Sequence, residues 1–155
     1  MALSTIRRAP SGLASDSQTR IFAVESKLAE MFSNLYSRGG CEQAIKIGLE
    51  LAADAELNKS GRLWLYMAAA YGQQHAALVR AGNADDAALA SSRNRALEAV
   101  RNAVSLDPAE NLPAFRMLYD RTDTARPRGE SDLVIFFGDP DFDRILLPPS
   151  HGDAI

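Results

Sequence analysis

Apolar residues recur every three or four positions along most of the chain, which is the spacing of amphipathic helices. The first stripe predicts a helix from about Ser17 to Tyr36, and its members are Ile21, Val24, Leu28, Met31 and Leu35. Gly39 or Gly40 is expected to end this helix, because glycine adopts the left-handed conformation that closes helices. A second helix is predicted from about Glu42 to Leu57.

A third helix is predicted from Arg62 to about Ala81, with an inner face of Trp64, Met67, Ala68, Tyr71, His75 and Leu78. Asn83 is the predicted N-cap of a fourth helix. That helix ends at Asp107, because the following Pro108 disfavours helical geometry in the residue before it. A short fifth helix is predicted from Pro113 to Tyr119.

The segment Leu133–Phe137, "LVIFF", is the only part of the sequence with strand character. Five residues without a partner strand do not form a stable sheet. We therefore expect this segment to be irregular or a short helix packed on the other helices. The pattern as a whole predicts an all-α fold of about five helices.

Two groups of residues carry a resemblance to a known repeat. Trp64, Met67, Ala68 and Tyr71 fit W-x2-L-G-x2-Y, with Met for Leu and Ala for Gly. A second group fits A-x3-F-x2-A-x4-P with Val for Phe, and it consists of Ala96, Val100, Ala103 and Pro108. Together they resemble one tetratricopeptide repeat (TPR), an antiparallel helical hairpin. In such a hairpin the large residues wedge into the next layer, and the small ones let the paired backbones approach closely.

The spacing departs from the repeat in one place. The repeat expects nine positions from the tyrosine to the first alanine of its second helix, whereas Tyr71 and Ala96 are 25 apart. Divided between two antiparallel arms, the surplus lengthens each helix by about eight residues, or roughly 12 Å. The resemblance therefore implies an elongated hairpin through residues 72–93.

Weaker similarity extends on both sides of this repeat. Residues 28–56 resemble an earlier repeat through Leu28, Met31, Phe32, Leu35, Ala44, Gly48 and Leu51, with Glu56 in place of the proline. Residues 111–119 resemble the start of a third repeat that is cut short. "DLVIFFGDPDFDRIL" is similar to the segment that caps many bacterial TPR proteins, through Asp132, Leu133, Phe136, Asp139, Pro140, Phe142 and Ile145. The resemblance implies a TPR-like domain over residues 17–147, with an irregular C-terminal cap.

The two ends of the chain are not expected to belong to the helical domain. Residues 1–16 are expected to be a disordered leader or a linker from an upstream domain, and residues 148–155 a flexible tail. The leader carries Arg7 and Arg8 and has no acid before Asp16, so an organelle transit peptide is the alternative.

The composition of the chain argues against several classes of function. With 155 residues, 46% hydrophobic and 24% charged, the sequence is typical of one soluble globular domain. Its net charge of −3 argues against nonspecific binding to nucleic acid or anionic membrane, and no stretch is apolar enough to span a bilayer. Cys41 is the only cysteine, which excludes an intrachain disulfide and favours a reducing, cytoplasmic setting.

Candidate chemistry is sparse. His75 is expected to be hydrogen-bonded inside the hairpin, and His151 to be solvated, so we predict no enzyme, metal or cofactor site. Asp139, Asp141 and Asp143 alternate as in a calcium loop, but the glycine and glutamate that such a loop requires are replaced by Arg144 and Ser150. These carboxylates are expected to cap a short helix and face water. Three arginines of the fourth helix are read as a solvated face, namely Arg93, Arg95 and Arg101.

The TPR resemblance implies a function. In that family the first helices of successive repeats line a groove for a peptide or helix of a protein partner. The corresponding positions here are Ser33, Tyr36, Arg62, Leu65, Ala69 and Gln73. A clamp for acidic C-terminal peptides would need lysine and asparagine where this chain has Ala29, Ser33 and Tyr66, so that ligand is disfavoured.

The function expected from the resemblance is therefore a noncatalytic interaction scaffold or adaptor, such as the C-terminal module of a larger protein. The alternative is a homodimerisation module in which the elongated hairpin packs on its twin.

Overall fold

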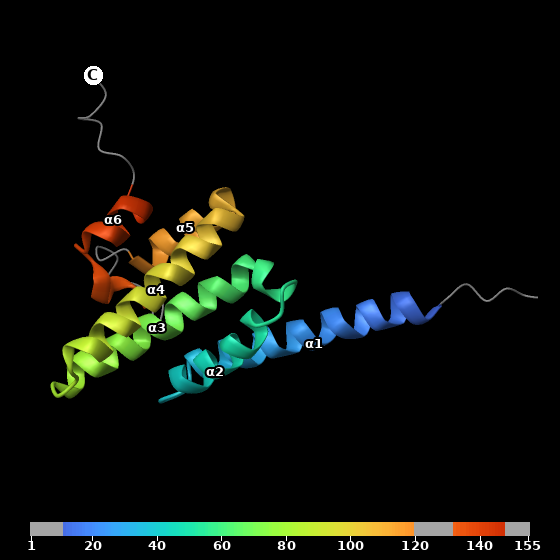
Figure 1. Ribbon diagram of the computed structural model, residues 1–155, viewed down its shortest axis with the longest axis horizontal. Helices are drawn as coiled ribbons and strands as arrows, with labels where there is room; N and C mark the ends of the chain where they lie inside the picture. Colours follow the sequence, from blue (N-terminus) through green and yellow to red (C-terminus); the bar gives the residue numbers. More distant parts are fainter. Residues whose placement is uncertain (1–10, 120–131, 148–155) are drawn as a thin grey trace, which may run out of the picture.

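The computed structural model describes residues 11–119 and 132–147, with side chains from residue 17 onward. These residues form six α-helices and two short 3-10 helices, and they contain no strand (Figure 1). The fold is all-α, as predicted. The elements are α1 (Ser11–Leu35), α2 (Cys41–Ala52), η1 (Leu57–Lys59), α3 (Gly61–Ala81), α4 (Asp86–Leu106), α5 (Pro108–Tyr119), η2 (Val134–Phe136) and α6 (Pro140–Leu146).

Two boundaries in the first half of the chain differ from the prediction. Helix α1 begins at Ser11, so residues 11–16 of the expected leader are helical. Helix α2 ends at Ala52 and does not reach Leu57. The reason is Asp54, whose Oδ1 accepts hydrogen bonds from the backbone N–H groups of Glu56 and Leu57 and so stabilises a turn there. Residues 1–10, 120–131 and 148–155 lie outside the described residues, so the expected flexible tail and His151 are not described.

The helix starts in the second half of the chain also differ from the prediction. Asp85, and not Asn83, is the N-cap of α4, because its Oδ1 accepts the backbone N–H of Ala88 at 2.7 Å. Helix α5 begins at Pro108 and not at Pro113. Proline is favourable at the first position of a helix, where its missing N–H needs no partner. Helix α4 ends at Leu106, one residue before the predicted end at Asp107, which is its C-cap.

The packing of α3 against α4 is as the sequence predicted. The inward residues of both helices are at most 4% exposed, and they are Met67, Ala68, Tyr71, Ala96, Val100 and Ala103. Trp64 is partly buried against this core and donates from Nε1 to the carbonyl oxygen of Asn58 at 2.6 Å. Each helix has 21 residues, against 12 in α2 and 12 in α5, so this hairpin is the elongated one.

Helices α1 and α3 lie side by side and run in the same direction (Figure 1). Three cross-helix contacts follow each other in the same order along both. Glu25 pairs with Arg62, the ring of Phe32 meets that of Tyr66, and the carbonyl of Leu35 accepts a hydrogen bond from Gln73. This parallel pair forms one face of the molecule.

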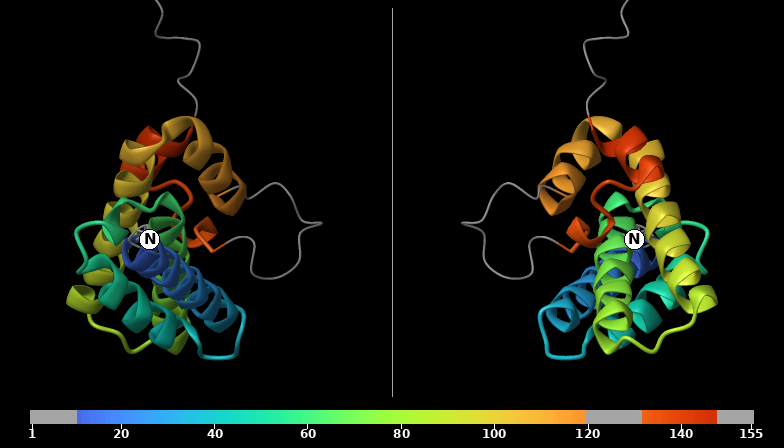
Figure 2. Two further views of the ribbon diagram at one scale, coloured as in Figure 1. Left: turned by 90° about the vertical axis from the view of Figure 1, so that its right-hand side faces the viewer. Right: turned by 90° about the vertical axis from the view of Figure 1, so that its left-hand side faces the viewer.

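Residues 132–147, named here the capping segment, return to the elongated hairpin. Figure 2 shows the segment between α5 and α3, and α6 also contacts α4. Its apolar anchors are at most 4% exposed, and they are Leu133, Phe136, Phe142 and Leu146. The expectation of an irregular or short helical segment at 133–137 is confirmed by η2.

Candidate functional site

The predicted groove residues lie along the face shared by α1 and α3, but they are not equally accessible. Ser33 on α1 and Tyr36 directly after this helix are exposed, and Tyr36 is 50% exposed. On α3, Arg62 is exposed and Leu65 is partly buried. Each of these four residues keeps some surface that a partner can contact.

The other two predicted residues are corrected by the structure. Ala69 is only 4% exposed, because it belongs to the core and not to the surface. The Gln73 side chain is occupied, since its Nε2 donates to the carbonyl of Leu35 at 2.9 Å and to Oδ1 of Asp132 at 3.2 Å. The start of the capping segment therefore covers the face of α3 at Gln73.

An aromatic cluster, which the sequence reading missed, lies on the open part of this face. The ring of Phe32 has its centroid 4.8 Å from that of Tyr36 and 5.5 Å from that of Tyr66. Phe32 is 45% exposed, and the sequence placed it only among the residues that resemble an earlier repeat. The available signal was the spacing of four between Phe32 and Tyr36, which puts both rings on one face of α1. We name Phe32, Tyr36 and Tyr66 the aromatic patch.

Charged residues border the aromatic patch toward the start of α3. The Arg62 guanidinium donates to the Glu25 carboxylate, and this hydrogen bond raises the pKa of Arg62. Both side chains are about half exposed, so a partner carboxylate can compete for the guanidinium. Beyond Arg62 and Leu65 lies a hollow of about 460 Å³, lined also by Lys59 and Glu110. The face shared by α1 and α3 thus presents charged side chains next to the aromatic patch.

A larger trough lies at the other end of the same face. Its volume is about 920 Å³, and its walls come from the end of α1, the distal half of α3 and the capping segment. Cys41 and Arg80 line it together with Asp132. Burial raises the pKa of the Cys41 thiol above its usual range, which makes this cysteine a poor nucleophile at neutral pH.

Asp132 is the most perturbed carboxyl group of this face. Burial raises its pKa to about 6, and the hydrogen bond from Gln73 opposes that rise only in part. Its Oδ2 is buried without a hydrogen-bond partner among the described residues. A group of this kind changes charge near physiological pH.

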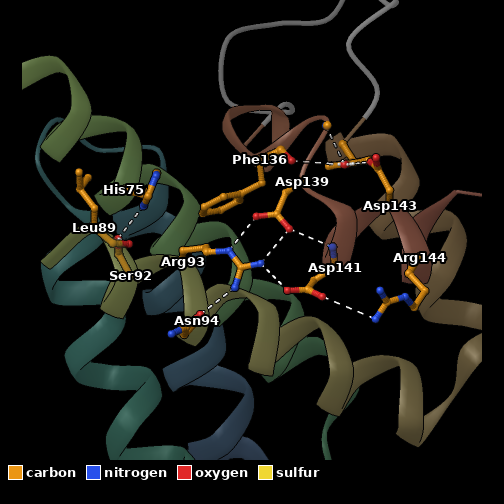
Figure 3. Close-up of polar contacts among 12 residues, drawn as sticks. His75, Leu89, Ser92, Arg93, Asn94, Phe136, Asp139, Asp141, Asp143 and Arg144 are labelled. Carbon is orange, nitrogen blue, oxygen red and sulfur yellow. Dashed lines mark hydrogen bonds and ion pairs between the residues drawn. The ribbon is translucent and has the colours of Figure 1, made fainter. Parts of the chain in front are cut away.

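A second polar cluster attaches the capping segment to α4 (Figure 3). Arg93 donates from Nε and Nη2 to the two carboxylate oxygens of Asp139, at 2.7 and 2.8 Å, and from Nη2 to Asp141 at 2.5 Å. The Arg93 hydrogen bond lowers the pKa of Asp139. The expectation that Arg93 belongs to a solvated face was wrong, because its side chain is only 27% exposed. Asp139 is the N-cap of α6, as expected, but it faces Arg93 and not water.

The remaining candidate, His75, is hydrogen-bonded inside the hairpin as predicted. Its Nδ1 lies 2.7 Å from Oγ of Ser92, and its ring meets that of Phe136 at 4.7 Å (Figure 3). Desolvation lowers the pKa of His75, so the ring is neutral at pH 7. Ser92 is 2% exposed, and its hydroxyl donates to the carbonyl of Leu89. This arrangement connects α3 to α4 and gives a substrate no access to the hydroxyl.

Within the described ranges, no three His, Cys, Asp or Glu side chains group so that they could hold a metal ion. No helix in the same part of the chain combines the length and apolar character needed to cross a bilayer.

No protein-family model, no curated protein and no solved structure matches this chain.

Proposed function

We propose that this protein is a noncatalytic adaptor of TPR type that binds a peptide or helix of a protein partner on the face shared by α1 and α3. The spacing of Trp64, Tyr71, Ala96 and Ala103 supports the TPR assignment, since the last three are buried in the core and Trp64 packs partly buried against it. The parallel course of α1 and α3 supports it as well, because equivalent helices of stacked repeats run in the same direction.

The aromatic patch is the observation that carries this proposal. Its rings are held against one another across two helices, so they lose little conformational freedom when a ligand docks. Aromatic side chains also dominate the binding energy of protein interfaces. The neighbouring Arg62–Glu25 pair supplies polar contacts that fix the orientation of the ligand. The ligand we propose is an extended peptide or amphipathic helix with apolar anchors, encountered in the cytoplasm.

Selection from a random peptide library tests the proposal, because it samples many peptide sequences at once and needs no chosen partner. The wild-type chain is used as bait beside a variant that carries Phe32→Ser and Tyr66→Ser. We expect wild type to enrich peptides with spaced apolar residues, and the variant to enrich none of them. Enrichment of the same peptides by both chains would remove the aromatic patch from the binding site.

A second candidate function is self-association. The flank of the elongated hairpin that includes His75 and Arg93 is covered by the capping segment, so it is a poorer dimer surface than the sequence suggested. The most exposed large apolar side chains among the described residues lie instead on α1, where Ile21 is 63% exposed and Phe22 is 76% exposed. Residues 17–23 of α1 are all exposed, and the ion pairs of Arg20 with Asp54 and Glu56 leave the apolar side chains of this stretch uncovered. Light scattering after gel filtration distinguishes the candidates: a dimer that Phe22→Ser converts to monomer supports self-association, and a monomeric wild type excludes it.

A further inference from the structure

The capping segment begins in direct contact with the groove side of α3. A Cβ atom at Gly72 would lie 2.2 Å from the carbonyl oxygen of Asp132, so only glycine allows the two backbones to approach this closely. The backbone N–H of Leu133 donates to the carbonyl of Leu118 and continues the attachment to α5. The capping segment therefore covers the face of α3 around Gly72, which lies further along this helix than the aromatic patch.

One amide group connects three elements at this point. Gln73 on α3 donates from the same Nε2 to the carbonyl of Leu35 on α1 and to the Asp132 carboxyl group of the capping segment. An amide nitrogen has two hydrogens, so both are used. No further donor on Gln73 is available to Asp132.

The surroundings of Asp132 favour its neutral form. Its Oδ2 is buried and has no hydrogen-bond partner in the described part of the chain, and a buried unpaired charge is strongly unfavourable. Leu35 is the last residue of α1, so its carbonyl lies at the negative end of the helix dipole. The charged and titratable groups of the other trough walls are Tyr36 directly after α1, Cys41 on α2 and Arg80 on α3. No ion pair between Arg80 and Asp132 is found among the described contacts.

We propose that the capping segment is a pH-sensitive latch on the groove: a proton on Asp132 holds the segment against Gly72 and Gln73, and loss of that proton loosens the segment and lengthens the face open to a partner. The claim that a longer face opens to a partner rests on the proposed adaptor function, whereas the pH dependence of the attachment does not.

The direction of the pH effect follows from the difference in the pKa of Asp132 between the latched and the loosened form. An aspartate released from the latch has its ordinary pKa of 3.8, whereas the latched one has a pKa of about 6. The latched form therefore binds the proton more tightly, so its full stability is present below pH 4 and is lost as pH rises to about 6. The pKa of Asp132 differs by roughly two between the two forms, which corresponds to a change on the order of a hundredfold in the equilibrium between latched and loosened forms.

Hydrogen exchange followed by mass spectrometry tests the latch on the full chain without a partner. Exchange of the amides of residues 133–137, corrected for intrinsic rates, is measured from pH 4 to pH 7.5 for wild type and for Asp132→Asn. Asp86→Asn, on the exposed first turn of α4, is the matched control.

We expect the protection of these amides to fall at least tenfold with rising pH in wild type and in the control. In Asp132→Asn the protection should not depend on pH, because the amide stays neutral. A wild-type profile that stays flat overturns the proposal even if Asp132→Asn fails to fold, and so does an equal fall in the folded variant. The peptide selection described above is a separate experiment, so failure of the latch and failure of the adaptor function are distinguishable.

Discussion

Arg93 on α4 and Asp139 at the N-terminus of α6 form a bidentate ion pair between residues 46 positions apart in sequence. Asp141 accepts a third hydrogen bond from the same guanidinium. The pair lies on the elongated part of the hairpin, so the additional length of α4 has a structural use. It provides a surface on which the capping segment is held.

Removal of this pair should loosen the capping segment. Arg93→Ala leaves the partly buried Asp139 carboxylate without its cation, whereas Asp141 keeps Arg144. We expect a loss of about 1–3 kcal/mol in the free energy of unfolding. Urea denaturation measures it. Arg101→Ala, on the exposed side of the same helix, should change that free energy by less than about 0.5 kcal/mol. Equal losses in the two variants would contradict the role given to Arg93.

The same pair predicts a dependence on acid. Arg93 lowers the pKa of Asp139 from 3.8 in the folded chain, so the pair stabilises the fold above about pH 4. That contribution is lost as pH falls through the folded-state pKa. The difference in melting temperature between wild type and Arg93→Ala should therefore shrink from pH 7 to pH 3. A difference that is constant over this range would show that the stabilisation does not depend on the Asp139 charge.

Gly72→Ala should displace the capping segment from α3. In an ordinary helix this substitution is favourable by about 0.5–1 kcal/mol. Here the new Cβ would meet backbone atoms of Asp132, which cannot move without the rest of the segment. We expect chymotrypsin to cleave faster at Phe136 and Phe137. Gly48→Ala is the control, because its Cβ would meet side-chain atoms of Met67 and Met31 and leave the segment in place. Unchanged cleavage in Gly72→Ala would contradict the close approach.

The contact between α3 and α4 predicts a size limit at Ala103. This residue is 0% exposed, and a leucine there would force the helices apart. We expect Ala103→Leu to lower the free energy of unfolding by about 1–3 kcal/mol. Ala90→Leu, at an exposed position of the same helix, should have little effect. Thermal unfolding followed by circular dichroism gives both values, and a neutral Ala103→Leu would show that the two helices are not packed as closely as described.

The helices could be predicted from the sequence because their signals are local. Apolar stripes located α1 to α3, and cap and proline signals located α4. The burial of Met67 follows from the stripe of α3, whereas that of Ala96 and Ala103 was expected from the resemblance to the repeat. The boundaries were less accurate because single side chains set them. Asp54 ends α2 early and Asp85 starts α4, and neighbouring polar residues looked equally suitable as caps.

The accessibility of the predicted groove residues was harder to predict, because segments distant in sequence decide which side chains are covered. Ala69 and Gln73 share a helix face with Arg62, but core packing buries the first and the capping segment occupies the second. Phe32 follows the core residue Met31 directly, and only the position of α3 shows that its ring turns toward Tyr66. Arg93 finds its partner 46 residues later, which no local pattern indicates.

The affinity of a library-selected peptide for two matched variants tests the adaptor proposal most directly. Phe32 on α1 and Leu49 on α2 are 45% and 46% exposed, but only Phe32 belongs to the aromatic patch. Fluorescence anisotropy with the labelled peptide gives the dissociation constant for wild type, Phe32→Ser and Leu49→Ser. We predict that Phe32→Ser weakens binding at least tenfold, or about 1.4 kcal/mol, and that Leu49→Ser binds as wild type does. Equal affinities for all three chains, or a loss confined to Leu49→Ser, would contradict the account.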